Sequence, residues 1–312
     1  MNSEYAIEVS HLTKKFGKNL AVDDISFQVR RGEVFGLLGP NGAGKTTTLR
    51  MITTLLKQTS GQITVFGHNT LKDSKAARAT FGLTGQYASV DEDISARENL
   101  LIFSRLNGLT HVASKQRATE LLEEFSLTES ADKPIADFSG GMRRRLDLAV
   151  SLITRPSLIF LDEPTTGLDP RTRSQMWETI RNLVDQGSTI VLTTQYLDEA
   201  DELADRVAVI DHGKLVKIGA PAALKQQVGS STLQLSLTDE HQLNAAQTIV
   251  TNQLHTSTKL SGGATIMAKL KHSDQVADVL IGFQKAGIAL NRITVQEPTL
   301  DDVFFNLTIG TN

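Results

Sequence analysis

The sequence predicts an α/β protein whose main sheet is largely parallel, followed by a smaller α+β domain. Short apolar segments alternate with helical stretches through about the first 220 residues, a pattern typical of parallel strands joined by crossover helices. Several of these segments are apolar at successive positions, as strands buried on both faces must be. A length of 312 residues accommodates two moderate domains.

The first domain is expected to contain a helical insertion. Residues 89–155 carry helical patterns instead of strand patterns: Ser95–Glu98 matches a capping box, and apolar residues from Ala118 to Phe125 recur at helical spacing. We therefore expect a helical subdomain of about residues 89–155. The expected strands around it are Ala6–Leu12, Ile25–Arg30, Glu33–Leu38, Gln62–Phe66, Thr80–Thr84, Ser157–Asp162, Ser188–Thr194 and Val207–Ile210.

The composition changes after residue 228, where Gln, Thr and Asn become more frequent. A boundary near Gly229 divides the chain into an expected cassette, 1–229, and a small accessory or regulatory domain, 230–312. The order βαββαβ, typical of a ferredoxin-like unit, is predicted for the second domain. Its expected elements are a strand at 232–237, a helix at 239–254, two strands joined at 261–263, a helix at 273–285, a strand at 289–295 and a last helix from Thr299.

Composition excludes several classes of protein. Lys and Arg number 32 against 35 Asp and Glu, a net charge of −3, which disfavours a strongly basic nucleic-acid binder. The absence of cysteine excludes disulfides and thiol catalysis. No apolar run approaches the roughly 18 to 20 residues of a membrane span, and no secretion signal is recognisable. The seven histidines show no metal-ligand spacing.

A phosphate-binding loop is the strongest motif. The segment from Gly39 to Thr46 fits G-x-x-x-x-G-K-[ST], follows an apolar strand and precedes a helical run. Backbone N–H groups of such a loop surround phosphates, Lys45 reaches the β and γ oxygens, and Thr46 ligates Mg²⁺. The predicted nucleotide-binding residues here are Gly39, Pro40, Asn41, Gly42, Ala43, Gly44, Lys45, Thr46 and Thr47.

The segment 158–163 predicts a Walker B element, an apolar strand that ends in Asp162 and is followed by Glu163. Asp162 is expected to hold Mg²⁺ through its water shell, and Glu163 to polarise an attacking water. Standing alone, the segment is more often an ordinary exit from a strand into a turn. The phosphate-binding loop in the same chain makes the functional interpretation the stronger one.

A second anion site is expected at Ser139-Gly140-Gly141, which precedes a helical run. Taken alone, the segment also fits a helix cap with two glycines in the turn. One phosphate-binding loop is enough to bind the phosphates of one nucleotide. A second anion site therefore implies a second nucleotide or a second copy of the chain. The run Arg143–Arg145 is expected to be a solvated helix face, with a basic patch toward a lipid or a partner as the alternative.

These elements, with Gln86 after a strand and Asp169 after the Walker B turn, resemble the ATP-binding subunit of an ABC transporter over about residues 5–225. The resemblance implies a head-to-tail dimer in which Ser139 of one copy closes over the γ-phosphate bound at Lys45 of the other. It implies that Gln86 reaches Mg²⁺ and couples to a membrane partner, that Asp169 lies across the dimer interface, and that Phe16 stacks on adenine. The implied metal-binding residues are Thr46, Gln86 and Asp162.

One position departs from the family pattern. Gln195 stands where most of the family has a histidine that contacts the γ-phosphate, and an amide can donate a hydrogen bond but cannot become a cation. With Ser139–Arg145 and the ending Glu297–Phe304, this glutamine resembles the daunorubicin-resistance type of bacterial exporter ATPase. In that type a separate membrane subunit contacts the substrate, so none is expected to touch this chain.

The predicted function is therefore ATP hydrolysis that energises export of a drug-like or lipid-like substrate, with ATP and Mg²⁺ as cofactors. The expected partners are a second copy and an integral membrane permease, with no nucleic acid, which places the chain in the cytoplasm on the inner face of the membrane. A slow or non-hydrolysing ATP switch is the first alternative, because Gln195 leaves the hydrolysis rate open. An ABC protein acting on nucleic acid or ribosomes is the second.

Overall fold

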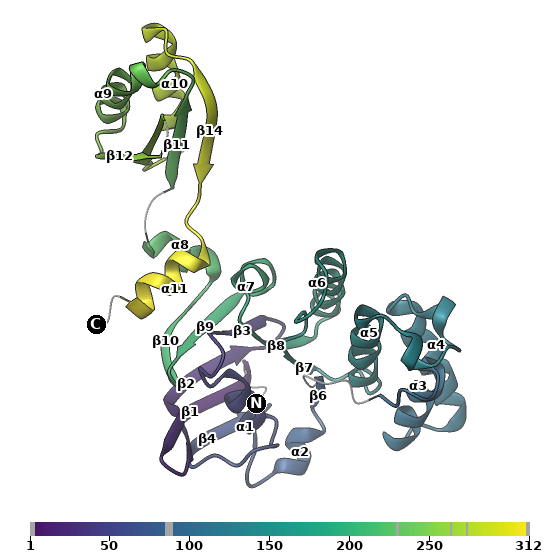
Figure 1. The fold of residues 1–312 in the computed structure, drawn as a ribbon. Coiled ribbons are helices and arrows are strands. Elements are labelled where there is room, and N and C mark those ends of the chain that lie inside the picture. Colours follow the sequence, from purple (N-terminus) through teal and green to yellow (C-terminus); the bar gives the residue numbers. More distant parts are fainter. Residues whose placement is uncertain (1–3, 85–89, 229–230, 263, 273, 310–312) are drawn as a thin grey trace. The chain divides into compact units, whose positions relative to one another are not determined.

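The computed structural model describes residues 4–84, 90–228, 231–262, 264–272 and 274–309. The chain divides into two units, Met1–Pro221 and Ala222–Asn312, each with its own core (Figure 1). The boundary near Gly229, with a separate domain at 230–312, stays a prediction. No helix in the described parts of the chain is both long enough and apolar enough to cross a membrane.

A six-stranded sheet is the centre of the first unit, in the order β10-β9-β3-β8-β7-β6. All neighbours from β9 to β6 are parallel, and β10 pairs antiparallel with β9. Every residue of β3, β7 and β8 is buried, in agreement with the apolar runs in the sequence. The bounds are β3 Val34–Leu38, β6 Phe81–Thr84, β7 Leu158–Asp162, β8 Thr189–Thr194, β9 Arg206–Asp211 and β10 Lys214–Gly219.

A four-stranded antiparallel sheet, β2-β1-β4-β5, forms a second layer of the same unit. One apolar core contains residues from this sheet, from the six-stranded sheet and from helix α1, so the three elements share one interior. The bounds are β1 Tyr5–Phe16, β2 Asn19–Arg30, β4 Ser60–Val65, β5 His68–Asn69 and α1 Lys45–Ile52.

Helices α3, α4 and α5 form the predicted helical group (Figure 1). The capping box is present: Glu98 N donates to Ser95 Oγ, and Ser95 N donates to the Glu98 carboxylate. The bounds of the helices in this unit are α2 Ser74–Arg78, α3 Ala96–Leu106, α4 His111–Glu124, α5 Gly140–Ser151, α6 Pro170–Asp185 and α7 Leu197–Leu203, with short 3₁₀ turns at Thr128–Ser130 and Ile135–Asp137.

The second unit has the strand order β12-β13-β11-β14, all antiparallel, with the element order βαββαβ. This is the ferredoxin-like arrangement that the sequence predicts. Residues of α9 and α10 share one core with the sheet. The bounds are β11 Thr232–Leu237, α9 Leu243–Leu254, β12 Thr258–Ser261, β13 Thr265–Lys269, α10 Gln275–Ala286, β14 Leu290–Gln296 and α11 Leu300–Ile309, with a 3₁₀ turn at Glu240–Gln242; α8, Pro221–Val228, spans the junction of the units.

Strand β10 is absent from the predicted strands. It lies at the edge of the six-stranded sheet, and its residues are exposed or half-buried. The strand begins with Lys214, and Lys217 interrupts its apolar residues. A strand covered on one side only needs no continuous apolar run, so its sequence gives a weak signal.

Candidate nucleotide-binding site

Three neighbouring strands bring the predicted catalytic segments to one edge of the six-stranded sheet. Strand β8 lies between β3 and β7, with Leu38 of β3 opposite Thr194 and Asp162 of β7 opposite Thr193. The phosphate-binding loop, Glu163 and Gln195 each follow the carboxyl end of one of these strands. This edge is where parallel α/β sheets hold their ligands.

Two positions of the loop between β3 and α1 require glycine. A Cβ on Gly39 would lie 2.1 Å from the carbonyl oxygen of Ile210. Gly44 has a φ of +108°, and a Cβ there would lie 2.6 Å from the carbonyl oxygen of Ala21. Both contacts are with backbone, which cannot rotate aside. The close approach keeps the loop tight against the sheet and starts α1 at Lys45.

Lys45, the first residue of α1, has 4% of its surface exposed. Its ammonium donates to the carbonyl oxygens of Gly39 at 2.8 Å and Pro40 at 3.0 Å. The nearest carboxylate oxygen is Glu163 Oε1, 4.0 Å away. Burial lowers the pKa of Lys45, while Glu163 and Asp162 oppose that effect. A buried cation with no close ion-pair partner fits an anionic ligand, and phosphate oxygens are such a ligand.

Asp162 and Thr46 form an oxygen-rich corner beside Lys45. Thr46 Oγ1 donates to Asp162 Oδ1 at 3.0 Å, and Thr193 Oγ1 donates to the same oxygen at 2.6 Å. Hydroxyl and carboxylate oxygens are the donors that Mg²⁺ prefers, and neighbouring ligands around that ion lie about 3 Å apart. The donor set therefore fits Mg²⁺.

Glu163 begins the turn after β7 in a left-handed conformation, with a φ of +49°. Its N–H donates to Thr193 Oγ1 at 3.0 Å and to the Thr193 carbonyl oxygen at 3.2 Å. Thr166 Oγ1 donates to Glu163 Oε2 at 3.2 Å. These contacts hold the carboxylate of Glu163 at the strand edge, on the same side as Lys45.

The structure describes two of the other three residues that are predicted to contact the nucleotide. Gln195 directly follows β8 and is half-buried. Phe16, 48% exposed, lies at the turn between β1 and β2, with Lys14 Nζ 4.9 Å from its ring centroid. Part of the Phe16 surface is thus accessible to a ligand. Gln86 lies outside the described residues.

The segment Ser139-Gly140-Gly141 begins helix α5. Ser139 Oγ accepts a hydrogen bond from Met142 N at 3.3 Å, which caps the helix. A Cβ on Gly141 would lie 2.3 Å from Thr172 Cγ2, so α5 packs closely on α6. Thr172 also donates to Asp169 at 2.6 Å through its hydroxyl and at 3.0 Å through its N–H. Ser139 and Asp169 are both exposed. The contact between Gly141 and Thr172 brings the helix starts that carry them close together.

The expectation of a solvated face at Arg143–Arg145 is wrong for Arg144, whose side chain is 13% exposed. Its Nη2 donates to the carbonyl oxygen of Asp162 at 2.9 Å, and its Nε to that of Pro164 at 3.0 Å. Sequence reasoning also missed Thr193 and Glu199. Glu199 is fully buried and accepts from Thr165 Oγ1 at 2.7 Å; its burial raises its pKa.

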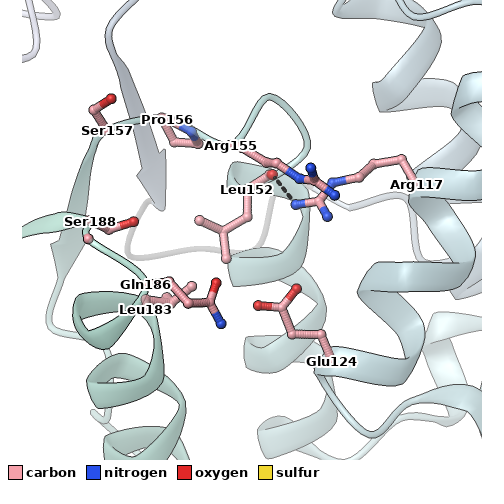
Figure 2. A pocket seen from close by; sticks show the side chains of 10 residues that line it. Arg117, Glu124, Leu152, Arg155, Pro156, Ser157, Leu183, Gln186 and Ser188 are labelled. Atoms are coloured by element: carbon pink, nitrogen blue, oxygen red, sulfur yellow. Dashed lines mark hydrogen bonds between the residues drawn. The ribbon is translucent and has the colours of Figure 1, made fainter.

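A cavity that is separate from this site lies elsewhere in the first unit. It encloses about 360 Å³ between α4, the end of α5 and the end of α6, and Figure 2 shows the Arg117 and Leu152 side chains in its wall. Ser157 and Ser188 precede β7 and β8, so the cavity lies at the amino ends of these strands. It is thus at the opposite sheet edge from Lys45. Among the described residues, no cluster of His, Asp and Glu forms a ready metal cage.

Known proteins with similar sequences and structures place this chain in a family. The family described as ABC transporter matches residues 22–166. The chain is 43% identical to the daunorubicin/doxorubicin resistance ATP-binding protein of Streptomyces peucetius, over 97% of this chain and 92% of that protein. It is 37% identical to the linearmycin resistance ATP-binding protein of Bacillus subtilis, over 97% and 98%.

A solved structure supports the same assignment. The structure of cbiO1 from Clostridium perfringens, part of the ABC transporter complex cbiONQ, superposes with a TM-score of 0.67 at 25% identity. The alignment covers 72% of this chain and 92% of that one. Together with the relatives that match over nearly the whole chain, it shows that this protein belongs to the ABC transporter family, as one of its ATP-binding, ATP-hydrolysing members.

Proposed function

We propose that two copies of this chain bind two Mg²⁺–ATP molecules between them, head to tail, and that hydrolysis energises an export-type membrane subunit. The observation that carries the proposal is the site around Lys45. A buried ammonium faces a strand edge where Asp162, Glu163 and Thr46 lie within one hydrogen-bonded group. Such a site binds polyphosphate with a divalent ion and can activate water.

Lys45 and the loop Gly39–Gly44 hold the phosphates in this proposal. The ammonium exchanges its bonds to the Gly39 and Pro40 carbonyls for bonds to the β and γ oxygens. The first N–H groups of α1 add their positive partial charge. Phe16 offers its exposed ring to the adenine base.

Three residues would hold Mg²⁺: Thr46, Asp162 and Gln86. When bound, the ion would neutralise negative charge on the phosphates. Glu163 accepts a proton from the attacking water, and its fixed turn aims the carboxylate. Gln195 donates its amide N–H to the γ-phosphate from the end of β8.

The surface of Ser139, Gly140 and Asp169 completes the site of the other copy. Ser139 and Gly140 are exposed at the start of α5, and the first N–H groups of this helix would donate to a γ-phosphate held by the second copy. Asp169 lies beside them through Thr172. Each copy therefore supplies Lys45 to one site and Ser139 to the other.

The relatives' names suggest the cargo and the partner. They speak of resistance to daunorubicin, doxorubicin and linearmycin and of Nod factor export. A drug-like or lipid-like molecule is the corresponding class here, carried by a separate permease. The chain would then work at the inner face of the membrane, bound through that permease and without touching the cargo.

Mixing two inactive variants tests the head-to-tail arrangement. Lys45→Ala removes the phosphate-binding ammonium, and Ser139→Arg places a bulky side chain at the start of α5. Either homodimer lacks an intact site, whereas a mixed dimer has one, formed by Lys45 of one copy and Ser139 of the other. A one-to-one mixture should recover up to about a quarter of the wild-type ATP turnover. No recovery, with both variants folded and able to associate, contradicts the proposal.

A further inference from the structure

Arg144 connects two parts of the chain that contact different nucleotides in the proposed dimer. These parts are helix α5 and the turn that carries Glu163. It lies on α5, the helix that Ser139 caps. Its guanidinium is buried against the turn after β7, with bonds to the carbonyl oxygens of Asp162 at 2.9 Å, Glu163 at 3.4 Å and Pro164 at 3.0 Å. Helix α5 is thus bonded to the turn that carries Glu163.

The contacted turn is one that needs support. Glu163 has a φ of +49°, a region that non-glycine residues occupy only when their surroundings fix them. Two separate nitrogens of Arg144 bond to carbonyls on either side of Glu163. Because the guanidinium is planar, these bonds fix the orientation of the turn as well as its distance from α5.

Helix α5 is one continuous helix, Gly140–Ser151, with contacts at both ends. At its far end, Arg117 of α4 donates to the carbonyl oxygen of Leu152 at 2.7 Å (Figure 2). Near its start, Gly141 packs on Thr172. Asp147, one turn after Arg144, pairs with its guanidinium at 3.5 Å. The Arg144 bonds lead directly from α5 to the Walker B turn.

We propose that Arg144 is a positioning residue that couples the two nucleotide sites: contact of α5 with the nucleotide of one copy sets the position of Glu163 for hydrolysis of the other. The coupling rests on the proposed head-to-tail dimer. Arg144 touches backbone carbonyls and lies outside the phosphate-binding loop, so it acts on Glu163 and leaves the grip of Lys45 on ATP unchanged.

The test compares Arg144→Lys with Arg145→Lys in the full-length protein. Lysine keeps the charge but replaces the two separate donor nitrogens of the planar guanidinium with a single nitrogen on a flexible stem, so it no longer fixes the orientation of the turn. Arg145 is the matched control, because it lies next to Arg144 on α5 but donates to the Phe125 carbonyl, away from the Walker B turn. ATP affinity is measured by calorimetry, and turnover is followed against ATP concentration.

We expect Arg144→Lys to lower kcat by about tenfold with ATP affinity within about threefold of wild type. The Hill coefficient of turnover should fall below that of wild type and of Arg145→Lys, while closure of the dimer on two ATP molecules keeps it above 1. A defect of folding alone would not change the Hill coefficient of the folded fraction, and matched circular dichroism verifies that the variants are folded. Equal kcat and equal cooperativity in the two lysine variants overturn the proposal.

Two outcomes separate this inference from the proposed function. A wild-type protein that dimerises on ATP and hydrolyses it without cooperativity overturns the coupling role and leaves the proposed function standing. A wild-type protein that never dimerises on ATP overturns both. Arg144→Met serves as a second variant, since it removes the bonds and the charge together, and it should lower kcat at least as far as Arg144→Lys does.

Discussion

Replacing Thr193 with valine should loosen both acidic residues of the nucleotide site at once. The Thr193 hydroxyl donates to Asp162 Oδ1 at 2.6 Å and accepts from Glu163 N at 3.0 Å. Thr193 is fully buried, so no water can take the place of the hydroxyl. Valine fills almost the same volume and removes the two hydrogen bonds without opening a cavity.

The size of the effect follows from the two bonds. A hydrogen bond to a charged group contributes about 1.5 to 3 kcal/mol. The Glu163 N–H keeps its bond to the Thr193 carbonyl oxygen at 3.2 Å, so it is not left unpaired. We expect a loss of about 2 kcal/mol in the free energy of unfolding. A similar loss of positioning at Glu163 lowers kcat by about tenfold, since about 1.4 kcal/mol corresponds to that factor.

Thr189→Val is the matched control on the same strand. Thr189 is buried at the other end of β8, where its hydroxyl accepts from Gly32 N at 2.9 Å. Loss of this neutral bond should cost about 1 kcal/mol and leave kcat unchanged. Urea unfolding by circular dichroism and steady-state ATP turnover measure both effects. The reasoning is refuted if the two variants are equally stable and turn over ATP at the same rate.

Three further changes give distinct results. Lys45→Ala should reduce ATP affinity in calorimetry, because the charge-assisted contacts to phosphate are lost; normal affinity would refute the assignment of the loop. Gln195→His should add a limb near pH 6.5 to the pH–rate profile, and Gln195→Ala should slow turnover; identical profiles for Gln, His and Ala mean that residue 195 does not contact phosphate. Burial raises the pKa of Glu199 above 4.5, so its contribution to stability is full below that value and is lost as pH rises through the raised pKa. Glu199→Gln should flatten this decline in pH-dependent unfolding, and an unchanged slope would contradict the assignment.

Linear motifs made much of the nucleotide site predictable. The glycine positions of the loop and the apolar strand before Asp162 are continuous in sequence, and the buried strands β3, β7 and β8 are recognisable from their apolar runs. Such signals can be recognised from the order of the residues along the chain alone. The predicted roles of the individual site residues stay predictions.

Two features could not be predicted because they depend on strand register and burial. Thr193 is 30 positions from Glu163 and meets it only because β8 pairs in parallel with β7. Arg144 stands in a run of three arginines that suggests a solvated surface. Its burial requires the carbonyl oxygens of Asp162 and Pro164 to converge on one guanidinium, which no local pattern indicates.

The central claim is that ATP closes two copies of this chain on each other and that Glu163 then directs hydrolysis. Glu163→Gln tests it most directly, with light scattering and nucleotide analysis of the protein eluted in Mg²⁺–ATP. The account predicts a dimer that retains two ATP molecules, with turnover at least about a hundredfold below wild type. A protein that stays monomeric in Mg²⁺–ATP, or turnover within about threefold of wild type, would contradict it.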